Sequence, residues 1–81
     1  MSDKKFGVVY TEVIQDPDLS LRAKGLYALL CSFADKNRQC FPSIATLAEL
    51  SGVTKQTIKR TLIELEKKTY VTRNGRHFTV R

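Results

Sequence analysis

A run of cationic and hydrogen-bonding side chains in the second half of the chain is the part of the sequence best equipped for chemistry. Lys55, Gln56, Thr57, Lys59 and Arg60 all fall within residues 55–60. Ammonium and guanidinium groups pair with phosphate oxygens, and amide and guanidinium groups also form paired hydrogen bonds to the edges of nucleobases. This set of residue types favours contact with a nucleic acid.

A second basic group lies close to the end of the chain. Arg73, Arg76 and His77 flank an Asn74-Gly75 pair, which separates two β-rich runs at residues 70–73 and 76–80. Asn-Gly between such runs is the strongest short-range signal for a hairpin, because both turn residues must accept a positive φ. We therefore predict a type I′ hairpin at this pair.

The basic run at residues 55–60 is predicted to lie on a helix. Ile58, Leu62 and Leu65 recur at helical spacing and predict one buried stripe on a helix at about residues 54–68. Thr54 precedes it as N-cap and leaves a partly positive helix N-terminus open toward a ligand. On this helix Gln56 and Arg60 face away from the stripe.

A shorter helix precedes this one. Pro42-Ser43 opens it with Ser43 as N-cap, and Gly52 ends it by taking the left-handed conformation. Two helices joined by a turn that contains glycine form a helix-turn-helix. Val53 is predicted to fill the crossing between the helices.

The first half of the chain is predicted to contain a further helix, a short strand or arm, and a loop that support the helix-turn-helix. A helix is predicted at about 21–34, with Ser20 as N-cap, and Gly25 within it suggests a close helix contact. The run 6–10 is predicted as a short strand or extended arm, and residues 35–39 as a polar loop. Tyr10 and Tyr27 are expected at the edge of the core.

Length, composition and charge limit the class of protein. The 81 residues suffice for one domain, and no apolar run is long enough for a membrane span or a signal peptide. Residues 1–40 carry six basic and five acidic groups, whereas residues 41–81 carry eight and three, so most of the net charge of +6 lies in the second half. Clustered positive charge is the electrostatic footprint of a nucleic-acid binder.

The two cysteines do not suggest a chemical site. Cys31 and Cys40 have neither the number of a disulfide framework nor the spacing of a zinc site, so we expect them to be reduced and structural, with Cys31 in the core and Cys40 half-buried. The only histidine lies in the predicted hairpin, and no nucleophile–base set or carboxylate pair is present. We expect no catalysis, metal or cofactor, and a cytoplasmic location.

The pattern resembles a known family. Leu47-Ala48, Gly52-Val53-Thr54, Thr57-Ile58 and Leu65-Glu66, followed by the hairpin, are similar to the winged helix-turn-helix DNA-binding domains. Asp18-Leu19-Ser20, Ala23-Lys24 and Phe41-Pro42-Ser43 more narrowly resemble the helix-turn-helix domains of plasmid and phage replication initiators. The resemblance implies that helix 54–68 is the recognition helix and the hairpin is the wing. Family members usually have Gly where this chain has Thr69, so we expect a differently built corner between helix and wing.

These observations predict a mainly α fold with a small β-hairpin wing, divided into an arm (1–17), a three-helix core (18–69) and the wing (70–81). The expected function is non-catalytic binding of double-stranded DNA in replication initiation, transcription control or DNA processing of a mobile element. The candidate DNA-binding residues are Ser43, Thr54, Lys55, Gln56, Thr57, Lys59, Arg60, Arg73, Asn74, Arg76 and His77.

The sequence is also compatible with other functions. The fold could serve as a protein–protein interaction or oligomerisation module. As a DNA-binding domain it contacts few base pairs, so we expect modest affinity unless it forms a homodimer or is tethered to a further domain. Ile63 points away from the main apolar stripe, so it either packs under the wing beside Val71 or Phe78 or forms a dimer contact. A small RNA-binding domain is less well supported, because the sequence predicts no stacking aromatic residues on a sheet face.

Overall fold

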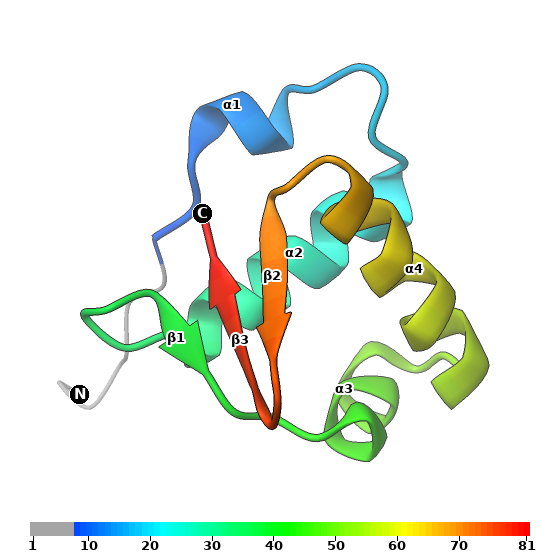
Figure 1. Cartoon of the computed structure of the whole chain (residues 1–81). Helices are drawn as coiled ribbons and strands as arrows, with labels where there is room; N and C mark the ends of the chain where they lie inside the picture. Colours follow the sequence, from blue (N-terminus) through cyan, green and yellow to red (C-terminus); the bar gives the residue numbers. More distant parts are fainter. Residues whose placement is uncertain (1–7) are drawn as a thin grey trace, which may run out of the picture.

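The computed structural model of the protein describes residues 8–81, whose arrangement is shown in Figure 1. Along these residues the elements are α1 (Thr11–Ile14), α2 (Leu21–Phe33), β1 (Gln39–Cys40), α3 (Ile44–Ser51), α4 (Lys55–Lys67), β2 (Val71–Asn74) and β3 (His77–Val80). Helices α2, α3 and α4 pack on one another, while β1 and β3 contact α2 and β2 contacts α4. The predicted fold class, mainly helical with a small sheet after the helices, is confirmed.

Each of the three longer helices begins at the predicted capping residue. The side chains of Ser20, Ser43 and Thr54 accept hydrogen bonds from the backbone N–H groups three residues ahead, at distances of 3.1, 3.0 and 3.2 Å. Each of these bonds satisfies a backbone donor that the first turn of a helix leaves free. Local sequence therefore sets where the helices of the core start.

The N-terminal part differs from the prediction. Residues 8–10 form no strand, and the short helix α1, which the sequence analysis missed, follows them. Residues 6 and 7 of the predicted strand or arm lie outside the described residues. Val13 of α1 is completely buried, so this single turn covers part of the core.

The sheet has three antiparallel strands in the order β1-β3-β2. The end of the predicted polar loop forms its third strand, since Gln39 pairs with Thr79 and Cys40 with Phe78. This strand was not predicted, because two residues are too few to show an alternating pattern. Through this pairing, the segment between α2 and α3 is hydrogen-bonded to the hairpin.

The hairpin turn lies one residue later than predicted. Asn74 pairs with His77, so the two loop residues are Gly75 and Arg76. Gly75 has φ 61°, whereas the φ angles of Asn74 and Arg76 are not positive. A positive φ at the first central residue alone is the pattern of a type II′ turn, which favours Gly there. The type I′ prediction was therefore wrong, and Asn74 belongs to strand β2.

The corner between α4 and β2 also contradicts the prediction. Thr69 has φ 59°, in the left-handed region. The N–H of Thr69 donates to the carbonyl of Glu66 and that of Tyr70 to the carbonyl of Leu65, each at 3.0 Å. These two bonds form a Schellman motif, the helix ending that usually places Gly at this position. The corner is thus built in the usual way, with a β-branched residue in a strained conformation.

The core joins all of these elements. It contains the predicted stripe of α4 together with residues of α1, the segment before α2, α2, α3 and the sheet, namely Val13, Leu19, Ala23, Leu26, Tyr27, Leu30, Cys31, Cys40, Leu47, Ala48, Ile58, Leu62, Leu65, Val71, Phe78 and Val80. Cys40 is fully buried rather than half-buried, and both thiols are free. A side chain at Gly25 would meet nothing within 4 Å, so the predicted close helix contact is wrong.

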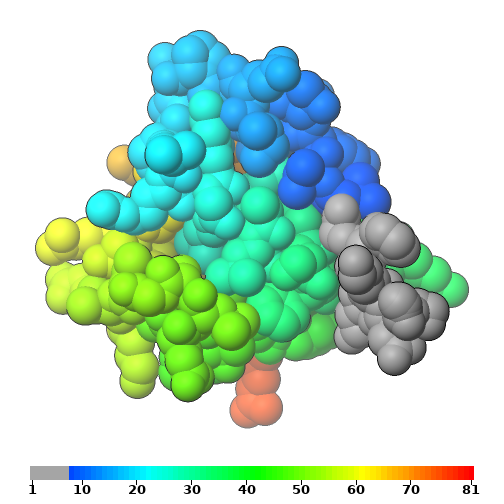
Figure 2. All heavy atoms as spheres, turned by 180° about the vertical axis from the view of Figure 1, so that it is seen from behind, coloured from blue at the N-terminus to red at the C-terminus, as the bar shows by residue number. Residues whose placement is uncertain are grey.

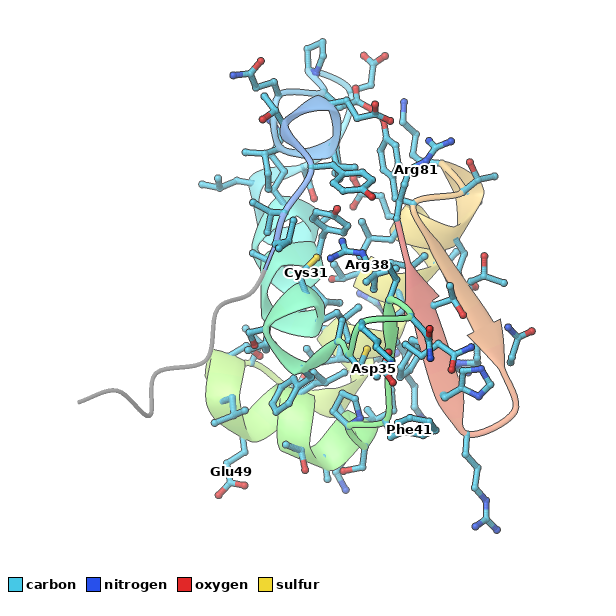
Figure 3. The ribbon with its side chains drawn as sticks, turned by 90° about the vertical axis from the view of Figure 1, so that its left-hand side faces the viewer. Cys31, Asp35, Arg38, Phe41, Glu49 and Arg81 are labelled. Atoms are coloured by element: carbon cyan, nitrogen blue, oxygen red, sulfur yellow. The ribbon has the colours of Figure 1, made fainter. Side chains whose placement is uncertain are left out.

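Arg38 and Tyr27 hold the end of the described chain against α2. The hydroxyl of Tyr27 donates to the carbonyl of Arg81 at 2.6 Å and accepts from the N–H of Tyr10 at 3.1 Å. The guanidinium of Arg38 donates to the carbonyls of Val8 and Arg81, and Figure 3 shows it between Cys31 and Arg81. Tyr27 is therefore a buried central residue rather than one at the core edge. None of the helices within residues 8–81 has the length and apolar character needed to cross a membrane.

Candidate nucleic-acid interface

One side of α4 carries the predicted basic group and is open to solvent. Lys55, Gln56, Lys59 and Arg60 are all exposed, while Ile58, between them in sequence, is buried. We refer to these four exposed residues as the basic face of α4. The face is fixed in direction, because the buried stripe on the opposite side anchors the helix in the core.

The turn before α4 leaves the helix N-terminus accessible. Gly52 has φ 74° and ends α3, and its N–H and that of Val53 both donate to the carbonyl of Ala48. The hydroxyls of Thr54 and Thr57 lie 3.0 Å apart, so Thr57 takes part in the cap. The first turn therefore presents its partly positive end toward solvent, as contact with phosphate requires.

The hairpin brings a second set of predicted residues beside α3. A hollow of about 390 Å³ is lined by Phe41, Pro42, Ser43, Ile44, Arg73, Gly75, Arg76 and Phe78. Arg73 also lines a hollow of about 300 Å³ between α4 and the hairpin, together with Lys59. The hairpin tip projects beyond the helical body, as Figure 2 shows from behind. Ser43, Lys59, Arg73 and Arg76 thus surround the same part of the surface.

The positive charge of this surface is not neutralised from within. Among residues 8–81 the ion pairs are Lys68 with Asp16 at 2.9 Å and Arg81 with Glu12 at 3.5 Å. In this described part of the chain none of the basic side chains of α4's basic face or the hairpin tip is paired with a carboxylate. Unpaired exposed cations remain available to displace the counterions of a polyanion.

Ile63 does not pack under the hairpin. Its side chain is 52% exposed and borders the hollow between α4 and the hairpin, so the predicted burial beside Val71 or Phe78 is wrong. Val71 and Phe78 are buried without it. The other possibility, a contact with a second molecule, stays a prediction.

Asn74 lies in strand β2 rather than in the predicted turn, whereas His77 lies in the second strand of the hairpin, as predicted. The ring of His77 lies 5.3 Å from that of Phe41. Phe41, which the sequence analysis did not select, is 65% exposed and lies at the base of β1 (Figure 3). Only the pairing of β1 with β3 brings these two rings together, so no local signal could have revealed the contact.

A cluster of polar residues away from this surface links the segment before α2 to the segment after α4. The carboxylate of Asp16 accepts from the hydroxyl of Tyr70 at 2.6 Å and pairs with Lys68. The hydrogen bond from Tyr70, then that from Lys68, lower the pKa of Asp16 to about 2, and the same contacts raise the pKa values of Tyr70 and Lys68. The carboxylate of Glu64 similarly accepts from the N–H and hydroxyl of Ser20 at 2.8 and 2.9 Å, which fixes α4 against the start of α2.

A three-helix core containing a helix-turn-helix, followed by a hairpin, defines the winged helix-turn-helix class. A family model described as a helix-turn-helix domain matches residues 18–71, about two thirds of the chain. The chain therefore belongs to this helix-turn-helix domain family, which supports DNA as its partner. No curated protein and no solved structure gave a significant match. The family match does not distinguish replication initiators from other helix-turn-helix proteins.

Proposed function

We propose that the protein binds double-stranded DNA without catalysing a reaction, with α4 in the major groove and the hairpin, as the wing, against the backbone. The observation that carries this proposal is the set of exposed, unpaired cations on two neighbouring elements, α4 and the hairpin. A helix of this width fits the major groove of B-form DNA, and cations on a flanking element suit its phosphates.

The candidate residues divide into two roles. Gln56 and Arg60 are proposed to contact base edges, since an amide and a guanidinium can each form paired hydrogen bonds to a base. The remaining residues are proposed to position the duplex through its phosphates, namely Ser43, Thr54, Lys55, Thr57, Lys59, Arg73, Asn74, Arg76 and His77. The process we propose is replication initiation, transcription control or DNA processing of a mobile element, in the cytoplasm.

The division of roles is tested by selecting preferred sites from a random duplex library and then comparing variants. Gln56→Ala and Arg60→Ala are expected to reduce discrimination between the preferred and a mutated site by roughly 5- to 150-fold, equivalent to about 1–3 kcal/mol. Arg76→Ala is the matched control and is expected to weaken binding to both sites equally. Unchanged sequence preference in both Gln56→Ala and Arg60→Ala would contradict the role of α4.

A second candidate function, as a protein-contact or oligomerisation module, is favoured by one observation. An apolar hollow of about 340 Å³ lies between α2, α3 and α4, bordered by Leu29 and by Leu50, which is 59% exposed. Sedimentation of the protein alone tests self-association at this surface. A dimer that Leu50→Glu dissociates would support the module.

A further inference from the structure

The outer face of the sheet carries a feature that duplex binding does not explain. The inner face is formed by buried residues such as Cys40, Val71, Phe78 and Val80. Because side chains alternate along a strand, the residues between them point outward. The register places Gln39, Thr79 and Thr72 in one row across the strands, and His77 beside Asn74 in the next.

Phe41 extends this second row. It follows Cys40, which pairs with Phe78, so it lies opposite His77. The two ring centres are 5.3 Å apart, with 41° between the ring planes. Phe41 is 65% exposed and is not part of the core. The sheet therefore presents the exposed ring of Phe41 to solvent, beside the half-buried ring of His77.

The surroundings of this aromatic pair are polar and basic. Phe41 also lines the hollow that contains Arg76 at the hairpin tip. Arg73, in contrast, pairs with Phe78 and lies toward the inner side of the sheet, where its guanidinium is 5.4 Å from the centre of the Phe78 ring. The nearest carboxylate along β1, Asp35, lies beyond its other end and accepts from the N–H groups of Asn37 and Gln39 at 2.8 and 3.1 Å. Such a surface suits a ligand that combines flat rings with negative charge.

We propose that Phe41, with the ring of His77 packed against it, stacks on an unpaired base of single-stranded DNA, and that Arg76 holds the adjacent phosphate. Aromatic side chains beside cations are the features by which proteins bind single strands, since every base has a face that can stack. An apolar protein partner would require more apolar surface than this outer face offers, because its other outward strand positions are Gln39, Thr72, Thr79 and Asn74. The inference extends the proposed duplex binding: a duplex with an unpaired end should bind more tightly than a blunt one.

The test compares a blunt duplex, the same duplex with an overhang of about six thymidines, and the single strand alone, each titrated by fluorescence anisotropy. The wild-type protein is expected to prefer the overhang duplex to the blunt one by about fivefold or more, the lower limit for stacking one base. A 2-aminopurine base in the overhang should lose fluorescence on binding, because stacking quenches it.

Variants at Phe41 separate stacking from other effects. Phe41→Ala and Phe41→Leu should abolish the preference, taken for each variant as the ratio of its overhang-duplex to its blunt-duplex affinity, and should abolish the quenching, whereas Phe41→Tyr should keep both. Phe33→Ala is the control, since Phe33 is 41% exposed on α2 and lines neither hollow beside the hairpin. Full activity of Phe41→Leu would show apolar contact and overturn the inference.

Other outcomes are equally decisive. Equal affinity of the wild-type protein for blunt and overhang duplexes would overturn the stacking site but not the proposed duplex binding. Binding of the single strand, sensitive to Phe41→Ala, without binding of the blunt duplex would contradict the duplex proposal and support the stacking site. The two proposals can therefore fail separately.

Discussion

Replacing Thr69 by glycine is expected to stabilise the protein. Thr69 has φ 59° at the end of α4, the same left-handed conformation that Gly52 adopts with φ 74° at the end of α3. This conformation costs a residue with a Cβ atom about 1–2 kcal/mol. Glycine removes that cost but loses about 0.5–1 kcal/mol more backbone entropy on folding. With the middle values of these ranges, about 1.5 and about 0.75 kcal/mol, the net gain in unfolding free energy is about 0.75 kcal/mol.

Thermal unfolding followed by circular dichroism measures this effect. For a domain of this size the gain corresponds to a rise in Tm of roughly 3–6 °C. The side chain of Thr69 is exposed and its hydroxyl bonds only to the neighbouring carbonyl of Lys68, so little packing is lost. Threonine stabilises strands by packing against neighbouring strands, but Thr69 lies between α4 and β2 and not in a strand.

Two control variants complete the experiment. Thr72→Gly, at an exposed position of β2 without positive φ, should lower Tm, because it loses entropy with no strain to relieve. Gly52→Thr should also lower Tm: a Cβ there meets nothing within 4 Å, so the cost is conformational alone. A Thr69→Gly protein whose Tm falls as much as that of Thr72→Gly would contradict backbone strain at Thr69.

The remaining predictions concern acid stability and the thiols. The pKa of Asp16 is lowered from 3.8 to about 2, so the ionised form stabilises the fold above about pH 4, and this contribution is lost as the pH falls from there toward 2. Urea titrations should show that Asp16→Asn removes this part of the acid dependence, and an unchanged profile would exclude the Tyr70 and Lys68 contacts as its cause. Burial raises the pKa of Cys40 to about 11 and also raises that of Cys31, so both thiols should react slowly with Ellman's reagent at pH 8 and rapidly in urea. Fast reaction of the folded protein would contradict the burial of these cysteines.

The parts of the fold that could be predicted from sequence are those with local causes. Ser20, Ser43 and Thr54 bond to backbone groups three residues away, and Gly52 adopts the conformation that only glycine takes cheaply. The stripe on α4 likewise follows from the helical repeat. These signals sufficed to place the helix-turn-helix and the basic face of α4.

The errors arose where distant segments decide the outcome. β1 forms because Gln39 and Cys40 pair with residues of β3, and a run of two residues shows no pattern from which this pairing could be predicted. The same pairing brought Phe41 to His77, which is why this aromatic pair on the sheet was missed. The hairpin turn shifted by one residue because strand register, as well as turn propensity, selects which residues form the loop. Ile63 stays exposed because Val71 and Phe78 are buried without it.

The most direct test of DNA binding is the salt dependence of duplex affinity, measured by fluorescence anisotropy with a selected site. Five exposed cations, Lys55, Lys59, Arg60, Arg73 and Arg76, are available to displace counterions. If about five do so, the logarithm of affinity should fall against the logarithm of salt concentration with a slope of roughly −4 to −5. Removing Lys59 and Arg76 together should reduce the slope by about two. A folded sample that binds no duplex at low salt, or binds it with an affinity independent of salt, would contradict the account.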